Sequence, residues 1–503
     1  MAHKTSVFDD LVEKLMKDWK AVGLSIAIVQ GDEIWSKAYG LADLSGEKCT
    51  EATIFDLAST SKTTTAAAVA CLVDDENFPA VQWTTPVSQL LPDDFVLQDA
   101  EATKNVTIED ILSHRSGMPR HDESYLSVRA EHPDDAKSMT RNLRHLPFNE
   151  ALRTTYQYNN IMYTVATHLV ETVSRQPYET FVQQRLWNPL DMTDTYHELP
   201  PSPAKFRLAT GYVWDKTTSS HVAIPSFPEP EGRGAGRIFS TASSYAKWIR
   251  ALLRGTAPLS AKVQKDLVAP RTIVPRTWDE SSTPHYAHTL YALGLEVDSY
   301  RGVRLVGHGG AVNGFKAHVA YLPERDWGVV MLGNSDDVYE VQQVLLHTLL
   351  DGVLGVKEGD AGAVDWPAFW RGEREREERE EKEKEDDEEF KVPEKPEALG
   401  VPVEELVGRY FNAGYKGLVL EIRDGKLVAD GSDRCFPWMM TFTHLTGNRF
   451  VATLRDAWGA GTYTEKMKAE FRFGGDGKVD AVGVAMEPSM SDHLIWFDLI
   501  KKE

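Results

Sequence analysis

Residues 55–63 have the sequence FDLASTSKT, in which the hydroxyl of Ser59 precedes the amine of Lys62 by three positions. The next residues, 66–73 (AAAVACLV), are mostly strong helix formers and predict a helix that begins near Ser59, with Ser59 or Ser61 as its cap. Because positions i and i+3 share one face of a helix, Lys62 could remove the Ser59 proton. The helix N-terminus would favour the negative charge that develops in acyl transfer. Taken alone, this stretch favours an ordinary capped and solvated helix start, because Ser and Lys are common surface residues.

The composition predicts a soluble protein with two or three domains. The chain has 503 residues, 42% of them hydrophobic, and a formal net charge of −21 that argues against nucleic acid or an anionic membrane as a partner. No run of eighteen apolar residues occurs and no signal-peptide core precedes residue 20, so we expect a cytoplasmic location. Cys49, Cys71 and Cys435 are too few and too scattered for a disulfide framework.

A run of charge divides the chain. Residues 373–389 are all charged, twelve acidic and five basic, and cannot bury a core. We expect a solvated helix or a disordered linker there, with an interaction tail as the alternative. The predicted domains are therefore a first domain at 1–358, a charged linker at 359–403 and a third region at 404–503.

The first domain is predicted to be α/β. Strand patterns cover 21–30 and 33–39 near the start and 304–306, 317–322 and 327–332 near the end, and helical patterns cover 245–253 and 338–350. If the strands at the two ends share one sheet, the helices between them form an all-helical insertion.

The last hundred residues have a different texture. Strand patterns flank the turns Asp424-Gly425 and Gly475-Asp476-Gly477, as in a series of hairpins. Residues 404–503 are therefore predicted to form an antiparallel β-barrel or sandwich.

A second motif supplies a tyrosine and an amide. Residues 156–163 (YQYNNIMY) place Tyr158 and Asn160 just before a helix-like stretch. A tyrosine beside an ammonium can have its pKa lowered enough to exchange protons with a serine, and an amide can bind both a lysine and a substrate carbonyl. A loop tyrosine packed on the core is the alternative.

A third motif is rich in glycine. Residues 307–311 (GHGGA) lead into a predicted strand, and glycines at a strand edge let a substrate approach the backbone, here at Gly309 and Gly310. The N–H of Ala311 could then pair with that of Ser59 in an oxyanion hole. A phosphate-binding loop is the rival interpretation, but the spacing matches neither G-x-G-x-x-G nor G-x-x-x-x-G-K.

The three motifs, in this order, resemble the serine β-lactamase and penicillin-binding-protein superfamily, and specifically its class C β-lactamase-like branch of esterases and D-aminopeptidases. S-x-x-K corresponds to Ser59 and Lys62, Y-x-N to Tyr158 and Asn160, and an H-x-G form of the third motif to His308 and Gly310. Segments 108–119, 188–193 and 236–242 are also similar to that family. The resemblance spans about residues 10–355 and implies an antiparallel sheet flanked by helices plus an all-helical subdomain.

The resemblance also implies roles. Ser59 would attack the acyl carbon, Lys62 and Tyr158 would share its proton, and Asn160 would orient Lys62 and the substrate. Which of Lys62 and Tyr158 is the formal base stays open, because coupled groups titrate as a pair. Where this family usually has lysine, the chain has His308, which with an ordinary pKa near 6.5 is a weaker anchor for a carboxylate. That difference favours esters, amides or D-aminoacyl substrates over penicillins.

The C-terminal region resembles the lipocalin-like domain that is appended to some members of this branch. Its Trp438, Phe442, Phe450 and Trp458 could line a ligand cavity, or they could fill a small barrel that covers the cleft or forms a subunit interface.

The sequence therefore predicts a serine hydrolase that forms an acyl-enzyme on Ser59 and cleaves esters or amides. An acyltransferase or peptide cyclase, a weak β-lactamase and a non-catalytic binding or scaffold protein are the alternatives. The chemistry requires no metal and no organic cofactor. The expected partner is a small-molecule or peptide substrate, and a homo-oligomer is possible.

Overall fold

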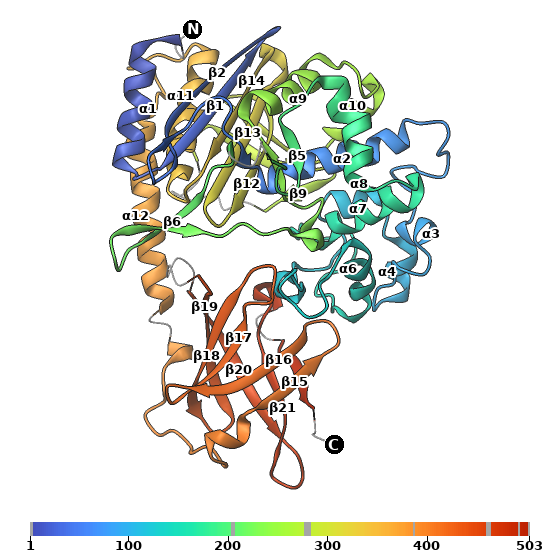
Figure 1. Cartoon of the computed structure of the whole chain (residues 1–503), viewed down its shortest axis with the longest axis vertical. Coiled ribbons are helices and arrows are strands. Elements are labelled where there is room, and N and C mark those ends of the chain that lie inside the picture. The colour runs from blue at the N-terminus through green and yellow to red at the C-terminus, as the bar shows by residue number, and fades with distance from the viewer. Residues whose placement is uncertain are drawn as a thin grey trace.

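The computed structural model describes residues 4–202, 207–275, 283–385, 388–458, 464–490 and 493–500. A sheet covered by helices forms the larger part, and a closed barrel lies at one end of it (Figure 1). None of the described helices combines the length and the apolar character needed to cross a lipid bilayer.

A nine-stranded antiparallel sheet organises the larger part, in the order β3-β2-β1-β14-β13-β12-β11-β10-β9. Its strands are β1 (Gly23–Gln30), β2 (Glu33–Asp43), β3 (Glu47–Lys48), β9 (Thr272–Val274), β10 (Tyr286–Tyr291), β11 (Glu296–Tyr300), β12 (Val303–Val312), β13 (Phe315–Leu322) and β14 (Trp327–Gly333). β1 pairs with β14 from Leu24 opposite Gly333 to Gln30 opposite Trp327. The strands at the two ends of the domain thus share one sheet, which confirms the predicted α/β architecture.

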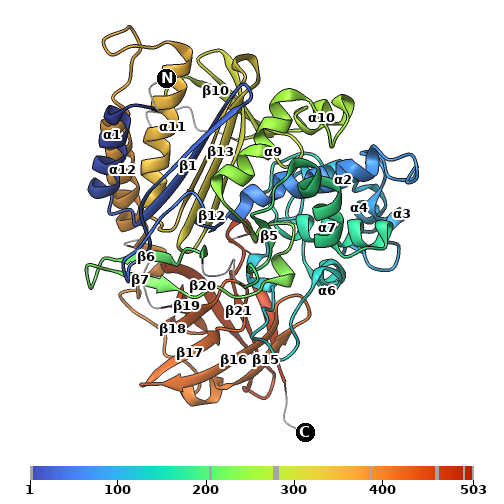
Figure 2. The same cartoon turned by 45° about the horizontal axis from the view of Figure 1, so that its top comes forward.

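Helices cover both faces of this sheet (Figure 2). On one face lie α1 (Ser6–Asp18), α11 (Val338–Leu354) and α12 (Trp366–Glu385), which share a hydrophobic core with that side of the strands. On the other face lie α9 (Ala242–Arg254), α10 (Ala261–Leu267) and α2 (Ser61–Val73). The helical insertion adds α3 (Val87–Leu90), α4 (Ala100–Asn105), α5 (Ile108–Leu112), α6 (Ala136–Asn142), α7 (Ile161–Ser174) and α8 (Tyr178–Val182). Short strands β4 (Phe55–Asp56), β5 (Thr195–His197), β6 (Gly211–Asp215), β7 (Ser220–Ile224) and β8 (Ile238–Ser240) complete this region.

The charged run is helical as far as residue 385, because it continues α12. The helix is attached to the domain by its first turns: Trp366 is only 3% exposed and donates from its indole nitrogen to Asp351 at 2.9 Å. Arg374 then forms an ion pair with Glu340 of α11 at 2.9 Å. The predicted limits of the three domains are not decided by this packing and stay predictions.

The C-terminal region is a closed antiparallel barrel of strands β15–β22. The strands are β15 (Gly408–Asn412), β16 (Lys416–Arg423), β17 (Lys426–Gly431), β18 (Trp438–Thr446), β19 (Arg449–Asp456), β20 (Thr464–Phe473), β21 (Val479–Val484) and β22 (Ile495–Leu499). Closure places Tyr410 of β15 opposite Leu499 of β22. Trp438, Phe442 and Phe450 are buried in the core, so these rings fill the barrel, while Trp458 stacks on Phe227 outside it.

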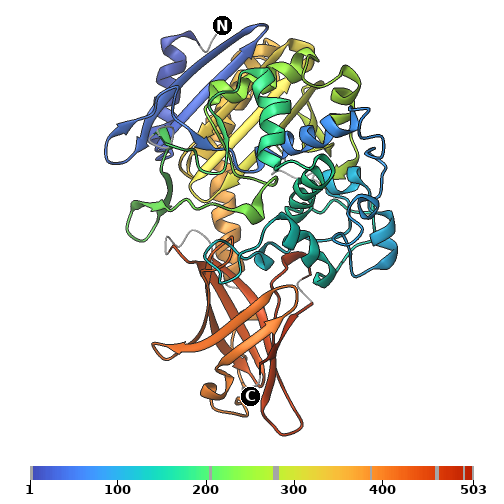
Figure 3. The same cartoon turned by 45° about the vertical axis from the view of Figure 1, so that its right-hand side comes forward.

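The rim of the barrel contacts the helical insertion, whose blue and teal ribbons lie directly above the barrel in Figure 3. The turn before β18 pairs with residues 125–127: Cys435 donates to the Tyr125 carbonyl at 3.1 Å, and Ser127 donates to the Asp433 carbonyl at 2.9 Å. His121 adds a side-chain hydrogen bond to Tyr415 at 2.6 Å. Hydrogen bonds from the barrel therefore fix the position of segment 121–127.

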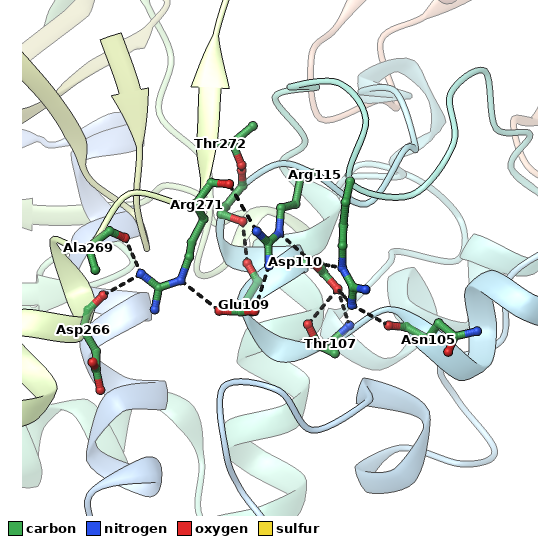
Figure 4. A network of polar contacts seen from close by, with 11 residues as sticks. Asn105, Thr107, Glu109, Asp110, Arg115, Asp266, Ala269, Arg271 and Thr272 are labelled. Atoms are coloured by element: carbon green, nitrogen blue, oxygen red, sulfur yellow. Dashed lines mark hydrogen bonds and ion pairs between the residues drawn. The ribbon is translucent and has the colours of Figure 1, made fainter.

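A network of arginines and carboxylates holds the chain just before this segment (Figure 4). Fully buried Asp110 accepts hydrogen bonds from Arg115 at 2.6 Å and from Arg153 at 2.7 Å, and Glu109 joins Arg115 to Arg271 just before β9. Burial raises the pKa of Asp110, but hydrogen bonds from Arg153 and Thr107 outweigh it and hold the pKa below its usual 3.8. The network joins the helical insertion to the edge of the sheet.

We expect Asp110→Asn to lower the free energy of unfolding by about 3 kcal/mol, because it leaves two guanidinium groups without their shared carboxylate. Urea denaturation at neutral pH measures this. Asp18→Asn, at an exposed carboxylate, is the matched control and should change the stability by less than about 0.5 kcal/mol. Equal effects of the two substitutions would contradict a structural role for the network.

Candidate active site

Ser59 lies in a 3-10 turn, Ala58–Thr60, that leads directly into α2. The turn is held by side chains: the Ala58 N–H donates to Asp56 at 2.8 Å, and the Thr60 hydroxyl donates to the Leu57 carbonyl at 2.8 Å. Ala58 has a φ of 46°, a left-handed conformation that is costly for a residue other than glycine. The expected Ser59 or Ser61 cap is not formed. Thr60 occupies the N-cap position, but its side chain accepts no hydrogen bond from the first turn of the helix. The Ser61 hydroxyl instead accepts from the Ile238 N–H at 3.2 Å.

Lys62 is fully buried on the first turn of α2. Its Nζ lies 3.0 Å from Ser59 Oγ and donates to the Ala235 carbonyl at 2.7 Å. Burial, and then the positive charge of Arg120, hold the pKa of Lys62 well below the ordinary 10.5, against the opposite influence of Asp122. The predicted contact between the hydroxyl and the amine is therefore present, and the fold favours the neutral amine.

Tyr158 lies over the same amine, with Lys62 Nζ 4.8 Å from the centre of its ring. The Tyr158 hydroxyl shares a hydrogen bond with Ser59, and this bond, like the charge of Arg120, lowers its pKa. Burial is the larger effect and raises the pKa of Tyr158 above 10.0, so the net shift is opposite to the lowering expected from the sequence. At neutral pH Tyr158 is a phenol that can donate a proton, not a phenolate.

Asn160 is buried beside Tyr158, but the hydrogen bonds of Lys62 go to Ser59 and Ala235 and none joins it to Asn160. Asn160 donates instead to Asp122 at 3.1 Å, and Asp122 forms an ion pair with Arg120 at 2.7 Å. The expected orientation of Lys62 by Asn160 is therefore not seen in the structure.

His308 projects from β12 and is only 3% exposed. Its Nε2 shares a hydrogen bond with the Tyr291 hydroxyl at 2.9 Å, and its Nδ1 donates to the Gly309 carbonyl at 2.5 Å. Burial first, and then the charge of Lys62, lower the pKa of His308 to about 3. The imidazole is neutral at pH 7 and offers no positive charge to a substrate carboxylate.

The backbone of β12 lies against the turn that carries Ser59, and α2 and β12 are neighbours in Figures 1 and 2. At Gly310 an added Cβ would lie 2.4 Å from the Leu57 carbonyl oxygen and 3.2 Å from the Ser59 nitrogen. Only glycine allows this approach. Ala311, which is exposed, is the next residue after Gly310. The backbone segments that contain Ser59 and Ala311, which are expected to form an oxyanion hole, are therefore adjacent.

These groups open onto one cavity of about 700 Å³. Of the predicted residues, Ser59, Tyr158, His308, Gly309, Gly310 and Ala311 line it. Lys62 and Asn160 lie behind that lining. No group of three or more described His, Cys, Asp or Glu side chains is placed to hold a metal ion.

Several neighbours of the site were not identified from the sequence as functional. The His114 ring lies 4.3 Å from the Tyr158 ring, and Arg120 lies 5.1 Å from it on another side. Tyr291 bonds His308, and Glu296 lines the cavity. Segment 108–119, which contains His114, resembled the family, but its sequence carries no signal for a contact with Tyr158.

Comparisons with known proteins identify the families that the two parts of the chain match. The profile of the family described as Beta-lactamase matches residues 8–351, and that of a domain of unknown function (DUF3471) matches residues 392–498. The unguisins hydrolase ungD' of Aspergillus campestris is 35% identical over 99% of this chain and 91% of its own.

Solved structures show the same fold. The octameric penicillin-binding protein homologue from Pyrococcus abyssi aligns with 99% of this chain and all of its own, at a TM-score of 0.62 and 20% identity. The D-amino acid amidase from Ochrobactrum anthropi SV3 aligns with 70% of this chain and 98% of its own, at a TM-score of 0.56 and 22% identity. The chain belongs to the β-lactamase family, with a closed eight-stranded barrel after the family domain.

Proposed function

We propose that this protein is a serine hydrolase that forms an acyl-enzyme on Ser59 and cleaves an ester or amide bond. The observation that carries the proposal is the 3.0 Å contact between Ser59 Oγ and Lys62 Nζ, whose buried amine has a lowered pKa. A neutral amine at this distance can accept the serine proton as Oγ attacks the substrate carbonyl.

The neighbouring groups supply the remaining steps. The N–H groups of Ser59 and Ala311 face the developing oxyanion, at a positive helix N-terminus. Tyr158, which stays protonated, gives its proton to the leaving group and recovers one from Lys62. Water then attacks the acyl carbon and releases the acid, while its proton returns to Ser59 by the same route. Asn160 acts indirectly, by holding Asp122 and with it Arg120 against Tyr158.

The substrate class follows from the neutral imidazole of His308. It offers no charge for the carboxylate of a penicillin or of a peptide end, so neutral esters and amides are favoured. A relative named as a hydrolase of unguisins and a fold neighbour that is an amidase of D-amino acids support amide substrates, including peptides with D-residues.

We expect Ser59→Ala to reduce hydrolysis of nitrophenyl esters by about 10³-fold or more and to abolish labelling by a fluorophosphonate. Peptide mass spectrometry of the labelled wild type should place the adduct on Ser59. Ser45→Ala, at an exposed serine, serves as the control and should keep both signals. An adduct that persists in Ser59→Ala would exclude Ser59 as the nucleophile.

The pH profile of kcat/KM should report Lys62. Since the charged amine cannot accept a proton, activity is lost as pH falls through the pKa of Lys62, which lies well below 10.5. Lys62→Arg, which stays charged, should lose activity at every pH. His308→Gln lowers the rate without moving the midpoint, because a pKa of about 3 lies below the measured range. If the midpoint of the acidic loss of kcat/KM moved in His308→Gln, that loss would be assigned to the titration of His308 instead of Lys62.

Gly310→Ala should abolish labelling of Ser59, because the new methyl group would push β12 away from the nucleophile's turn. The matched variant is Gly309→Ala, where an added Cβ meets nothing nearer than His318 Nδ1 at 4.0 Å and the loss should be much smaller. The rate of fluorophosphonate labelling compares the two. Equal losses would show that the close approach at Gly310 is not needed.

A further inference from the structure

The cavity continues beyond Ser59 around the free edge of β12. β11 pairs with β12 only as far as Glu296 opposite Gly307, so the edge of the next residues is not covered by β11. Beyond this edge the cavity extends to the face of the sheet that α11 covers. There it is lined by Glu296 and His318 of the sheet, Gln343 and His347 of α11, and Trp370 of α12. We call this part the rear chamber.

Glu296 faces the rear chamber because of its position in β11. Side chains alternate along a strand, and Tyr300, four residues on, belongs to the core beneath α11. Val297 belongs to the opposite core, on the side of α2 and α7. The Glu296 carboxylate therefore lies on the α11 side, at the end of the strand where the cavity passes the sheet.

The rear chamber contains three hydrogen-bond acceptors that the described chain does not use. The Glu296 carboxylate makes no hydrogen bond or ion pair with any described residue. The Gln343 amide, in a residue only 7% exposed, is likewise without a partner in the described part of the protein. His347 donates from Nδ1 to the Gln343 carbonyl at 2.6 Å, which leaves its buried Nε2 as a free acceptor. Glu296 is half-buried, and the chamber also holds one buried donor without a partner among the described residues, Trp370 Nε1. The unused acceptors, of which Glu296 can carry a negative charge, indicate a ligand that donates hydrogen bonds.

The charge of the cavity favours a cation. Burial lowers the pKa of His318 and His347 to about 4, so both imidazoles are neutral, as is His308. The one described guanidinium that lines the cavity, Arg120, is already paired with Asp122. Burial, and then the Asp298 carboxylate, raise the pKa of Glu296 to about 7. A cation bound beside Glu296 would stabilise its carboxylate and so oppose both causes of the raised pKa.

We propose that the rear chamber binds the basic side chain of a peptide-like substrate, lysine or arginine, whose scissile carbonyl lies at Ser59. This inference rests on the proposed hydrolase function. Gly310, against Ser59, and Gly307, opposite Glu296, are three residues apart on β12, or about 10 Å. An extended lysine side chain with its hydrogen bond covers that separation. The rings of Trp370 and Tyr339 add faces that attract a cation.

Binding to the Ser59→Ala protein tests the proposal without turnover. Titration calorimetry at pH 8 compares Nα-acetyl-lysinamide with Nα-acetyl-norleucinamide, which has the same chain without the ammonium, each in both enantiomers. We expect at least about tenfold tighter binding of one lysine enantiomer, and Glu296→Gln in this background should remove the difference. Glu404→Gln, at an exposed carboxylate in the short turn before β15, is the matched control and should preserve it. Equal affinity for the two ligands would overturn the proposal.

Turnover by the wild-type enzyme gives a second test that needs no variant. The ratio of kcat/KM for the nitrophenyl esters of Nα-acetyl-lysine and Nα-acetyl-norleucine should be about ten or more for one enantiomer. A ratio near one in both enantiomers would overturn the proposal even if Glu296→Gln failed to fold. Failure of the proposed function looks different, because then neither ester would acylate Ser59, and the calorimetric comparison would still decide whether the rear chamber binds a cation.

Discussion

The burial of one amine is the constraint on which the candidate active site of this protein depends. Lys62 is fully enclosed, and its Nζ touches Ser59 Oγ at 3.0 Å and the Ala235 carbonyl at 2.7 Å. An ammonium in this place would lose its hydration without a counter-ion in direct contact, so the surroundings favour the neutral form. These surroundings depend on α2, which is buried along almost its whole length. They also depend on β12, which can approach the turn that carries Ser59 because Gly310 has no side chain.

The residues that face this amine come from a segment that is held at both ends by distant parts of the chain. Residues 114–127 carry His114, Arg120 and Asp122 to Tyr158 and Asn160. The network of Asp110 with its arginines precedes this segment, and the turn of the barrel at 433–435 pairs with its end. The barrel therefore supports the candidate active site through backbone pairing, which gives it a physical role besides any interface it forms.

Much of the fold could be predicted because it depends on local sequence patterns. Alternation and turns at Asp424-Gly425 and Gly475-Asp476-Gly477 indicated the hairpins of the barrel, and the early and late strand patterns indicated a shared sheet. The spacing of Ser59 and Lys62 predicted their contact, since neighbours three residues apart meet on any helix. The pKa of Tyr158 is raised where a lowering was expected, and Asn160 bonds Asp122 where a bond to Lys62 was expected, because both depend on which residues pack around them. Glu296 carries no sequence signal, and only the end of β11 against β12 brings it to the cavity.

The sequence by itself thus determined the order of the elements and the identity of the three motifs, since these depend on residue type and short-range spacing. The tertiary structure alone decided the protonation states and the shape of the site. Desolvation by residues from distant segments lowers the pKa of Lys62 and of His308 and keeps Tyr158 protonated. Strand pairing that ends at Gly307 opens the rear chamber. These are sums over contacts between residues hundreds of positions apart, which a linear pattern does not contain.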